Sequence, residues 1–176
     1  KMLPWRGDDP PWISGKVGTS GGERIQTSPY GTWVSEIMCQ QTRVETAVGY
    51  YLKWMKKFPT VKSLSLATSE EVNSLWAGLG YYRRARMLHE GSKYVMEKHN
   101  GTLPSSIEEL KLIPGIGPYT AGAISSIAFQ KPEPLVDGNI IRLVSRLRAC
   151  SASPKNSQLV KFCWLVESFE IFFHFF

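Results

Sequence analysis

Cysteine and histidine are scarce in this chain. Its 176 residues include three cysteines, Cys39, Cys150 and Cys163, which lie far apart and form no Cys-x-x-Cys pair, and three histidines without ligand spacing. An odd number of separated cysteines is not the pattern of a disulfide framework, and no spacing of a zinc site is visible. We therefore predict no metal ligands and interpret the cysteines as small buried side chains in a reducing compartment.

Strand patterns and long apolar runs are also missing. No segment alternates apolar and polar residues over the length of a strand, which predicts an all-α fold. The Phe-rich tail at 168–176 is too short to span a membrane, so we expect no membrane partner. The first residues lack the apolar stretch of a signal peptide, and Lys1 is not an initiator, so we expect a piece of a longer protein.

Basic residues exceed acidic residues. Lysine and arginine number 21 and aspartate and glutamate 15, which gives a formal net charge of +6. A surplus of this size suits a polyanionic partner, although many basic proteins bind no nucleic acid. The length and the 43% hydrophobic content allow one compact domain or two small lobes.

Helical spacing begins after residue 28. We predict a helix over 29–40 in which Trp33, Glu36, Ile37 and Gln40 share one face. The preceding residues 14–28 carry four glycines and predict a flexible loop.

Further helices follow from apolar spacing and from capping patterns. The segment from Thr42 predicts a helix with a buried stripe at positions 44, 48, 51, 52 and 55. Capping boxes at 68–71 and 105–108 each predict the start of a helix. The other predicted helices cover 82–98, 118–129, a segment that starts near 139, and 157–169.

Residues 105–129 predict a helix–hairpin–helix unit. Gly115 and Gly117 permit a sharp turn and a close approach to a partner, and Pro118 suits the first turn of the next helix. The free amides of the turn and of the helix N-terminus form an anion site that can hold a DNA phosphate. The alternative is a tight turn with no ligand; the basic chain favours phosphate binding.

Two carboxylates can serve glycosidic chemistry. Asp137, in the segment 136–139 (VDGN), can stabilise an oxocarbenium-like state, although a plain helix N-cap is the default interpretation. Glu36 lies beside Trp33 and apolar neighbours, which would raise its pKa and suit it to act as a general acid. Its alternative is a surface glutamate on an amphipathic helix.

A glycine turn, two tyrosines and three arginines follow one another at residues 78–86. Aromatic side chains can wedge between base steps, and arginines can hold phosphates. The alternative is a core tyrosine followed by a solvated basic helix face. Gln40 and Gln41 can reach base edges or cap a helix end.

Four segments in this order resemble the MutY-type adenine DNA glycosylases of the helix–hairpin–helix glycosylase superfamily. The similar segments are 33–44 (WVSEIMCQQTRV), 75–82 (LWAGLGYY), 113–120 (IPGIGPYT) and 136–139 (VDGN). Residues 3–6 (LPWR) also resemble the N-terminal signature of that family. Their order and spacing between residues 29 and 148 make the resemblance specific.

The resemblance implies a monofunctional adenine DNA glycosylase of base excision repair. Such enzymes hydrolyse the N-glycosidic bond of adenine mispaired with 8-oxoguanine or guanine in double-stranded DNA. Carried over, Glu36 would protonate the adenine N7, Asp137 would stabilise the oxocarbenium ion, and Tyr119 and Asn139 would position the reacting groups. We expect a monomer, in the nucleus and also in mitochondria for a eukaryote, or in the cytoplasm for a bacterium.

The resemblance also implies contacts with DNA around the reacting base. Gln41 and Tyr81 would be inserted into the duplex around the opposite oxidised guanine. Leu3 and Trp5, with the DNA-binding Arg6, would line the pocket for the extruded adenine, which must leave the stack to react.

Two alternatives remain open. The endonuclease III type shares the hairpin and the aspartate, but it carries a lysine nucleophile where this chain has Tyr119 and lacks an equivalent of Glu36. Without that lysine no Schiff base forms, so we expect no strand cleavage. The other alternative is a DNA-binding fragment without turnover.

The chain departs from the family pattern toward its end. The family carries a [4Fe–4S] cluster on four cysteines spaced C-x6-C-x2-C-x5-C and a Nudix-like domain; Cys150 and Cys163 do not fit that spacing, so we expect no cofactor. We predict an N-terminal segment (1–28), a six-helix lobe (29–136) with the hairpin unit, and the start of the iron–sulfur lobe (137–176). The second lobe would be truncated, with an atypical tail, and activity would be impaired.

Overall fold

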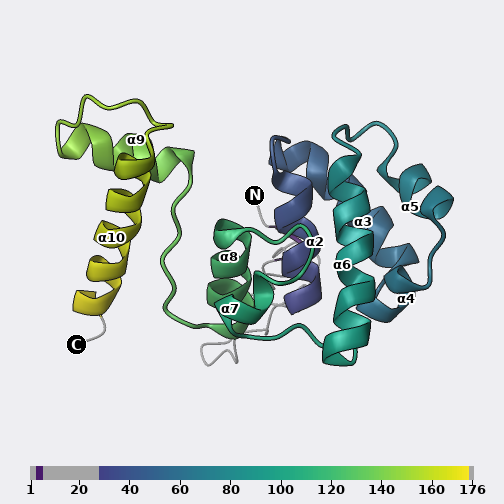
Figure 1. The fold of residues 1–176 in the computed structure, drawn as a ribbon. Helices are drawn as coiled ribbons and strands as arrows, with labels where there is room; N and C mark the ends of the chain where they lie inside the picture. Colours follow the sequence, from purple (N-terminus) through teal and green to yellow (C-terminus); the bar gives the residue numbers. More distant parts are fainter. Residues whose placement is uncertain (1–2, 6–27, 175–176) are drawn as a thin grey trace, which may run out of the picture.

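The computed structural model describes residues 3–5 and 28–174, with side chains up to Val166 (Figure 1). Secondary structure in these residues is helical, without a strand, which confirms the all-α prediction. The helices are α2 (Pro29–Cys39), α3 (Val44–Lys57), α4 (Val61–Ser65), α5 (Ser69–Trp76), α6 (Arg83–His99), α7 (Ile107–Leu110), α8 (Pro118–Phe129), α9 (Gly138–Leu147) and α10 (Ser157–His174). Arg6 and nearly all of the predicted glycine-rich loop lie outside the described residues.

Helices α2 to α8 enclose one hydrophobic core. Trp33, Trp54 and Trp76 are completely buried in it, and the rings of Trp54 and Trp76 meet edge to face with centroids 5.5 Å apart. The Trp54 Nε1 donates a hydrogen bond to the Tyr30 hydroxyl (3.2 Å), which donates to the Phe58 carbonyl (3.0 Å). Burial raises the pKa of Tyr30, so the hydroxyl stays neutral. These bonds fix the start of α2 against the end of α3.

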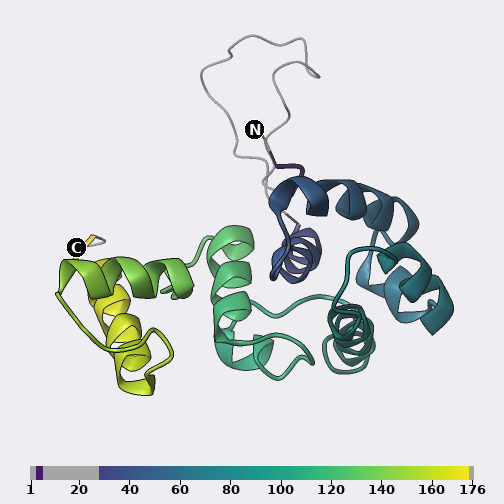
Figure 2. The same ribbon diagram turned by 90° about the horizontal axis from the view of Figure 1, so that it is seen from above.

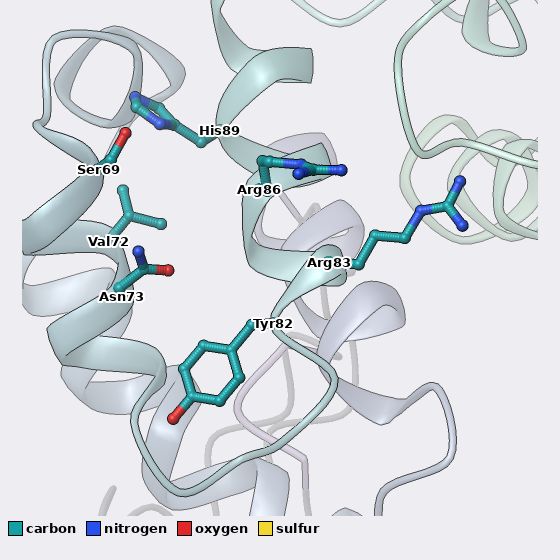
Figure 3. Close-up of a pocket in the computed structure, with 7 residues that line it drawn as sticks. All are labelled: Ser69, Val72, Asn73, Tyr82, Arg83, Arg86 and His89. Carbon is teal, nitrogen blue, oxygen red and sulfur yellow. The ribbon is translucent and has the colours of Figure 1, made fainter.

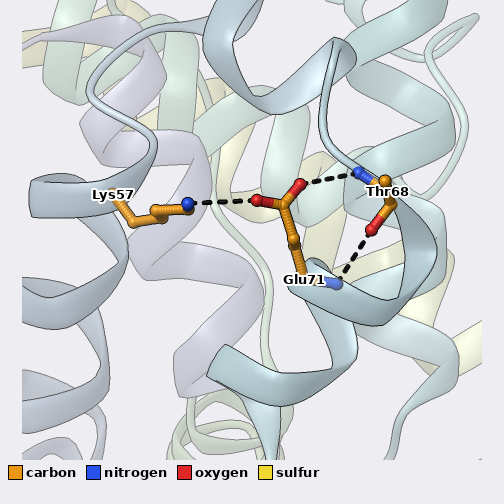
Figure 4. A network of polar contacts seen from close by, with 3 residues as sticks. All are labelled: Lys57, Thr68 and Glu71. Carbon is orange, nitrogen blue, oxygen red and sulfur yellow. Dashed lines mark hydrogen bonds and ion pairs between the residues drawn. The ribbon is translucent and has the colours of Figure 1, made fainter.

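The predicted capping box at 68–71 is confirmed. The Thr68 amide donates to Glu71 Oε2 (3.0 Å), and the Glu71 amide donates to Thr68 Oγ1 (3.2 Å) (Figure 4). Lys57 Nζ lies 3.0 Å from Glu71 Oε1 and links the end of α3 to this cap. The box predicted at 105–108 was placed one residue too early, because Ser106 is the N-cap and accepts from the Glu109 amide.

Helix α3 differs from its prediction. It begins at Val44 rather than at Thr42, and its buried face is Ala47, Tyr51 and Trp54. Val44 and Leu52 are 39% and 54% exposed, so the predicted stripe was wrong at these positions. The predicted stripe also missed Ala47, whose small side chain suits the close approach of a neighbouring helix, and Trp54, which is completely buried. Helix α4 was not predicted; it is a short helix capped reciprocally by Thr60 and Ser63.

Helices α9 and α10 pack on each other to one side of the larger group, around a small core of Val136, Val144, Leu159 and Cys163 (Figures 1 and 2). An extended connector, 130–137, joins them to α8. It crosses α8 closely at Gly122, where a Cβ would lie 3.0 Å from the Pro134 carbonyl oxygen and from Leu135 Cδ2.

None of the described helices combines the length and the apolarity that crossing a bilayer requires.

Candidate functional site

The hairpin turn between α7 and α8 is fixed by one of its two glycines. Gly115 has φ +85°, a left-handed conformation that favours glycine, and a Cβ there would lie 2.7 Å from the Cβ of Met87. Gly117 is extended and has open space where a Cβ would lie. It is the N-cap of α8 and has no side chain to cap the helix, and the N-terminus of a helix favours an anion.

Helix α2 carries Glu36 and is held against this turn. Its neighbours Trp33 and Ile37 are buried, whereas Glu36 is half-buried. Gly91 of α6 lies between α2 and the turn: a Cβ at Gly91 would lie 2.7 Å from Cζ2 of Trp33 and 2.9 Å from the Pro114 carbonyl oxygen. The position of the turn relative to Glu36 therefore depends on close packing against α6.

A cavity of about 460 Å³ brings residues from distant segments together. Glu36 and Gln41 reach it from the end of α2, Tyr119 from the first turn of α8, and Asp137 from the start of α9. Cys39 and Gln40 complete its lining. The two predicted catalytic carboxylates thus face one space next to the N-terminus of α8.

Asp137 is the N-cap of α9, which confirms the default interpretation of this residue as a helix cap. Its Oδ1 accepts from the amides of Asn139 and Ile140, both at 2.8 Å, and its Oδ2 accepts from the Asn139 Nδ2 at 2.7 Å. Partial burial acts to raise the pKa of Asp137, but these hydrogen bonds and the charge of Arg142 outweigh it and hold the pKa below its ordinary value. The group is therefore a carboxylate at neutral pH, held in one orientation.

A second cavity of about 350 Å³ adjoins the first and shares Gln40 and Gln41 with it. Tyr81 and Gly115 also line this cavity. Three residues predicted to contact DNA therefore lie together: Gln41 after α2, Tyr81 before α6 and Gly115 in the hairpin turn. Gln41 (φ +54°) and Tyr81 (φ +50°) are both left-handed, which costs a non-glycine residue on the order of 1–3 kcal/mol. Tyr81 is 62% exposed.

The described N-terminal residues lie on the larger core. Trp5 is buried and meets Tyr51 edge to face at 5.0 Å, and Leu3 packs half-buried against the same core. Their role in an adenine pocket stays a prediction, and that of Arg6 falls outside the described residues.

A third cavity, of about 340 Å³, lies between α5 and α6 (Figure 3). Ser69 and Asn73 line it from α5, and the His89 ring is directed toward them from α6, whereas Arg83 and Arg86 point away from α5. His89, interpreted from the sequence as a bystander, is buried, and its Nε2 has no hydrogen-bond partner among the described residues.

The residues present do not fit an iron–sulfur cluster of the kind that the family carries. Such a cluster needs four thiolates, and the chain has three cysteines. Cys39 packs against the larger core, whereas Cys150 and Cys163 belong to the small one. In the described residues no three metal-ligating side chains gather at one place.

Arg84 is a residue of the site that sequence reasoning missed. It lines the second cavity and donates hydrogen bonds to backbone carbonyls of two separate segments. It stood within the basic run at 78–86, but its contacts depend on tertiary structure, and no signal in the sequence distinguishes it from Arg83 or Arg86.

Comparisons with known proteins agree with this geometry. Residues 34–166 match the model of the HhH-GPD superfamily of base excision DNA repair proteins. The adenine DNA glycosylase of Rattus norvegicus is 51% identical over 136 residues, which are 77% of this chain and 26% of that protein. That of Schizosaccharomyces pombe is 42% identical over 169 residues, which are 92% and 36% of the two chains. This chain thus spans about a quarter to a third of the length of these relatives.

Solved structures share the fold. A thermostable thymine-DNA glycosylase superposes with a TM-score of 0.73 at 20% identity, covering 94% of this chain and 70% of that one. Endonuclease III in a trapped covalent intermediate with DNA gives 0.69 at 21% identity, covering 93% and 79%. The predicted helix–hairpin–helix glycosylase fold is confirmed. The chain belongs to the HhH-GPD superfamily of base excision DNA repair proteins.

Proposed function

We propose that this chain carries the catalytic residues of a monofunctional adenine DNA glycosylase, which hydrolyses the N-glycosidic bond of adenine opposite 8-oxoguanine or guanine. The observation that carries the proposal is the placing of Glu36 and Asp137 on one cavity, beside the N-terminus of α8. Glycosidic cleavage uses two carboxyl groups in this way. The names of the relatives support adenine as the base.

The proposed mechanism divides the work between the two carboxyl groups. Glu36 gives a proton to N7 of the extruded adenine, so that the base leaves with the electron pair of the glycosidic bond. Asp137 stays ionised, because its hydrogen bonds lower its pKa, and its charge stabilises the oxocarbenium ion. Water then adds to the sugar carbon and gives its proton to the Glu36 carboxylate, which leaves an abasic site. Asn139 holds the carboxylate of Asp137, and Tyr119 orients the sugar.

The proposed partner is double-stranded DNA containing the mispair, bound by a monomer. The amides at Gly115 and Gly117 hold a backbone phosphate, and Gln41 and Tyr81 enter the duplex around the opposite base. We further propose that the chain divides at residue 136 into a hairpin-containing lobe and a second lobe.

A single-turnover assay on an 8-oxoguanine·adenine duplex, followed by alkali, tests the proposal. Strand breaks that appear only after alkali support a monofunctional glycosylase. A covalent complex trapped by borohydride would instead assign a lyase, although Tyr119 stands where the lyases carry lysine. Duplex binding without abasic sites would assign a binding module.

A further inference from the structure

The guanidinium of Arg84 lies between two segments that are distant in the sequence. Its Nη1 donates to the carbonyls of Ile37 (3.1 Å), Met38 (3.0 Å) and Gln40 at the end of α2. Carbonyls at the end of a helix have no partner within the helix, so a cation there is well placed. This nitrogen therefore caps the C-terminus of α2, the helix that carries Glu36.

The other terminal nitrogen faces the turn before α6. Nη2 donates to the carbonyls of Gly80 (3.2 Å) and Leu79 (3.4 Å). Both nitrogens share Thr42 Oγ1 as an acceptor, each at 3.2 Å. One guanidinium thus joins the α2–α3 turn to the α5–α6 turn.

Aromatic rings complete the surroundings of this guanidinium. Its carbon lies 5.3 Å from the ring centroid of Tyr81 and 5.4 Å from that of Trp76. Trp76 Nε1 donates to the Gly80 carbonyl (2.9 Å), which also accepts from Arg84. Arg84 therefore restrains Tyr81 in two ways. Its guanidinium packs against the Tyr81 ring, and it binds the Gly80 carbonyl, which belongs to the peptide before Tyr81.

Two of these acceptors are the carbonyls directly before the two left-handed residues. The Gln40 carbonyl shares a peptide plane with the amide of Gln41, and the Gly80 carbonyl shares one with the amide of Tyr81. Fixing those planes limits how Gln41 and Tyr81 can relax. Left-handed non-glycine residues persist only where their surroundings determine them, and Arg84 supplies such surroundings at both positions.

We propose that Arg84 is a positioning residue, which holds Gln41 and Tyr81 at a fixed separation so that both enter the duplex together around the opposite base. This inference rests on the proposed function for the identity of the duplex and assigns Arg84 no part in bond cleavage. Lysine cannot replace it, because one ammonium nitrogen cannot face both turns as the planar fork does.

The test uses duplexes with 2-aminopurine beside the guanine opposite adenine, bound by the 176-residue chain with Glu36→Gln, so that no turnover intervenes. Insertion of Gln41 and Tyr81 unstacks the reporter and raises its fluorescence. We expect Arg84→Lys to abolish that rise and to weaken binding about 10-fold. Arg148 is an exposed arginine at the end of α9, and Arg148→Lys should leave the fluorescence rise and the affinity unchanged.

A folding defect is separated from the positioning role by circular dichroism and by a second variant. Thr42→Val removes the shared acceptor and the hydrogen bond that Thr42 Oγ1 donates to the Gln40 carbonyl (3.3 Å). We expect a partial loss of the fluorescence rise with an unchanged melting curve. An undiminished rise in a folded Arg84→Lys chain, or in Thr42→Val if Arg84→Lys does not fold, would overturn the inference. Absence of base release in the enzyme with Glu36, together with an Arg84-dependent rise, would sink the proposed function and leave the positioning role standing.

Discussion

Trp33 of α2 packs against Gly91 of α6 so closely that no methyl group fits between them. A Cβ on Gly91 would lie 2.7 Å from Cζ2 of Trp33, and the Pro114 carbonyl oxygen of the hairpin turn would lie 2.9 Å away on its other side. One glycine therefore lets three segments meet: the helix of Glu36, the helix of Arg84 and the proposed phosphate-binding turn. The relative positions of Glu36, Arg84 and the turn therefore depend on the packing around Gly91.

Gly91→Ala should lower the free energy of unfolding by about 1–3 kcal/mol, because the added methyl meets a buried ring and a backbone oxygen that cannot move aside cheaply. Urea unfolding measures this change. Gly49→Ala is the matched control on α3, where a Cβ meets nothing within 4 Å, so helix propensity should raise stability by up to about 1 kcal/mol. Equal effects at the two positions would contradict the packing argument.

Glu36→Gln should reduce base release by about 10²- to 10⁴-fold, the usual contribution of a general acid, while duplex binding persists. Single-turnover rates and fluorescence anisotropy separate the two effects. Glu70→Gln, an exposed carboxyl in the first turn of α5, serves as the control and should leave the rate unchanged. Base release that survives Glu36→Gln would remove the assigned role.

Asp137 has two roles that two substitutions can separate. Asparagine is a good N-cap, so Asp137→Asn should keep most of the stability and lose base release, because the negative charge is gone. Asp137→Ala should lose base release and also about 1 kcal/mol of stability, since the bonds from the Asn139 and Ile140 amides disappear. Normal turnover by a stable Asp137→Asn chain would reduce this residue to a helix cap.

Local signals predicted most of the fold, and tertiary contacts account for what they missed. Pro118 before an apolar run and Thr68 before Glu71 predicted helix starts correctly, because caps and proline act within one turn. The buried face of α3 was wrong at Leu52, since burial depends on which helix lies opposite rather than on apolarity.

The candidate site shows the same division. The resemblance to the adenine DNA glycosylases predicted that Glu36, Tyr119 and Asp137 act together, and the structure puts all three on one cavity. The role of Arg84 could not be predicted, because its acceptors at Ile37 and Gly80 are brought together only when α2 and α6 pack.

The stability of the chain should fall as the pH is lowered below about 6.5, with His89 as one cause. Burial, and then the charge of Lys93, lower the pKa of His89, although a hydrogen bond with the Ala67 backbone and the charge of Glu90 act the other way. The unfolded imidazole therefore takes up its proton at a higher pH than the folded one. Between these two pKa values each drop in pH stabilises the unfolded state, and the loss is complete below the folded value.

Urea unfolding at about pH 7.5 and pH 5.5 measures this loss on either side of the unfolded pKa. His89→Gln, which cannot take up a proton in this range, should show a smaller difference in the free energy of unfolding than the parent chain. His99→Gln removes an imidazole at the end of the same helix and controls for the substitution itself. The pH dependence of the His89→Gln chain could instead equal that of the parent chain. That result would contradict the prediction, because it would mean that burial of His89 without a partner for Nε2 does not disfavour its protonation.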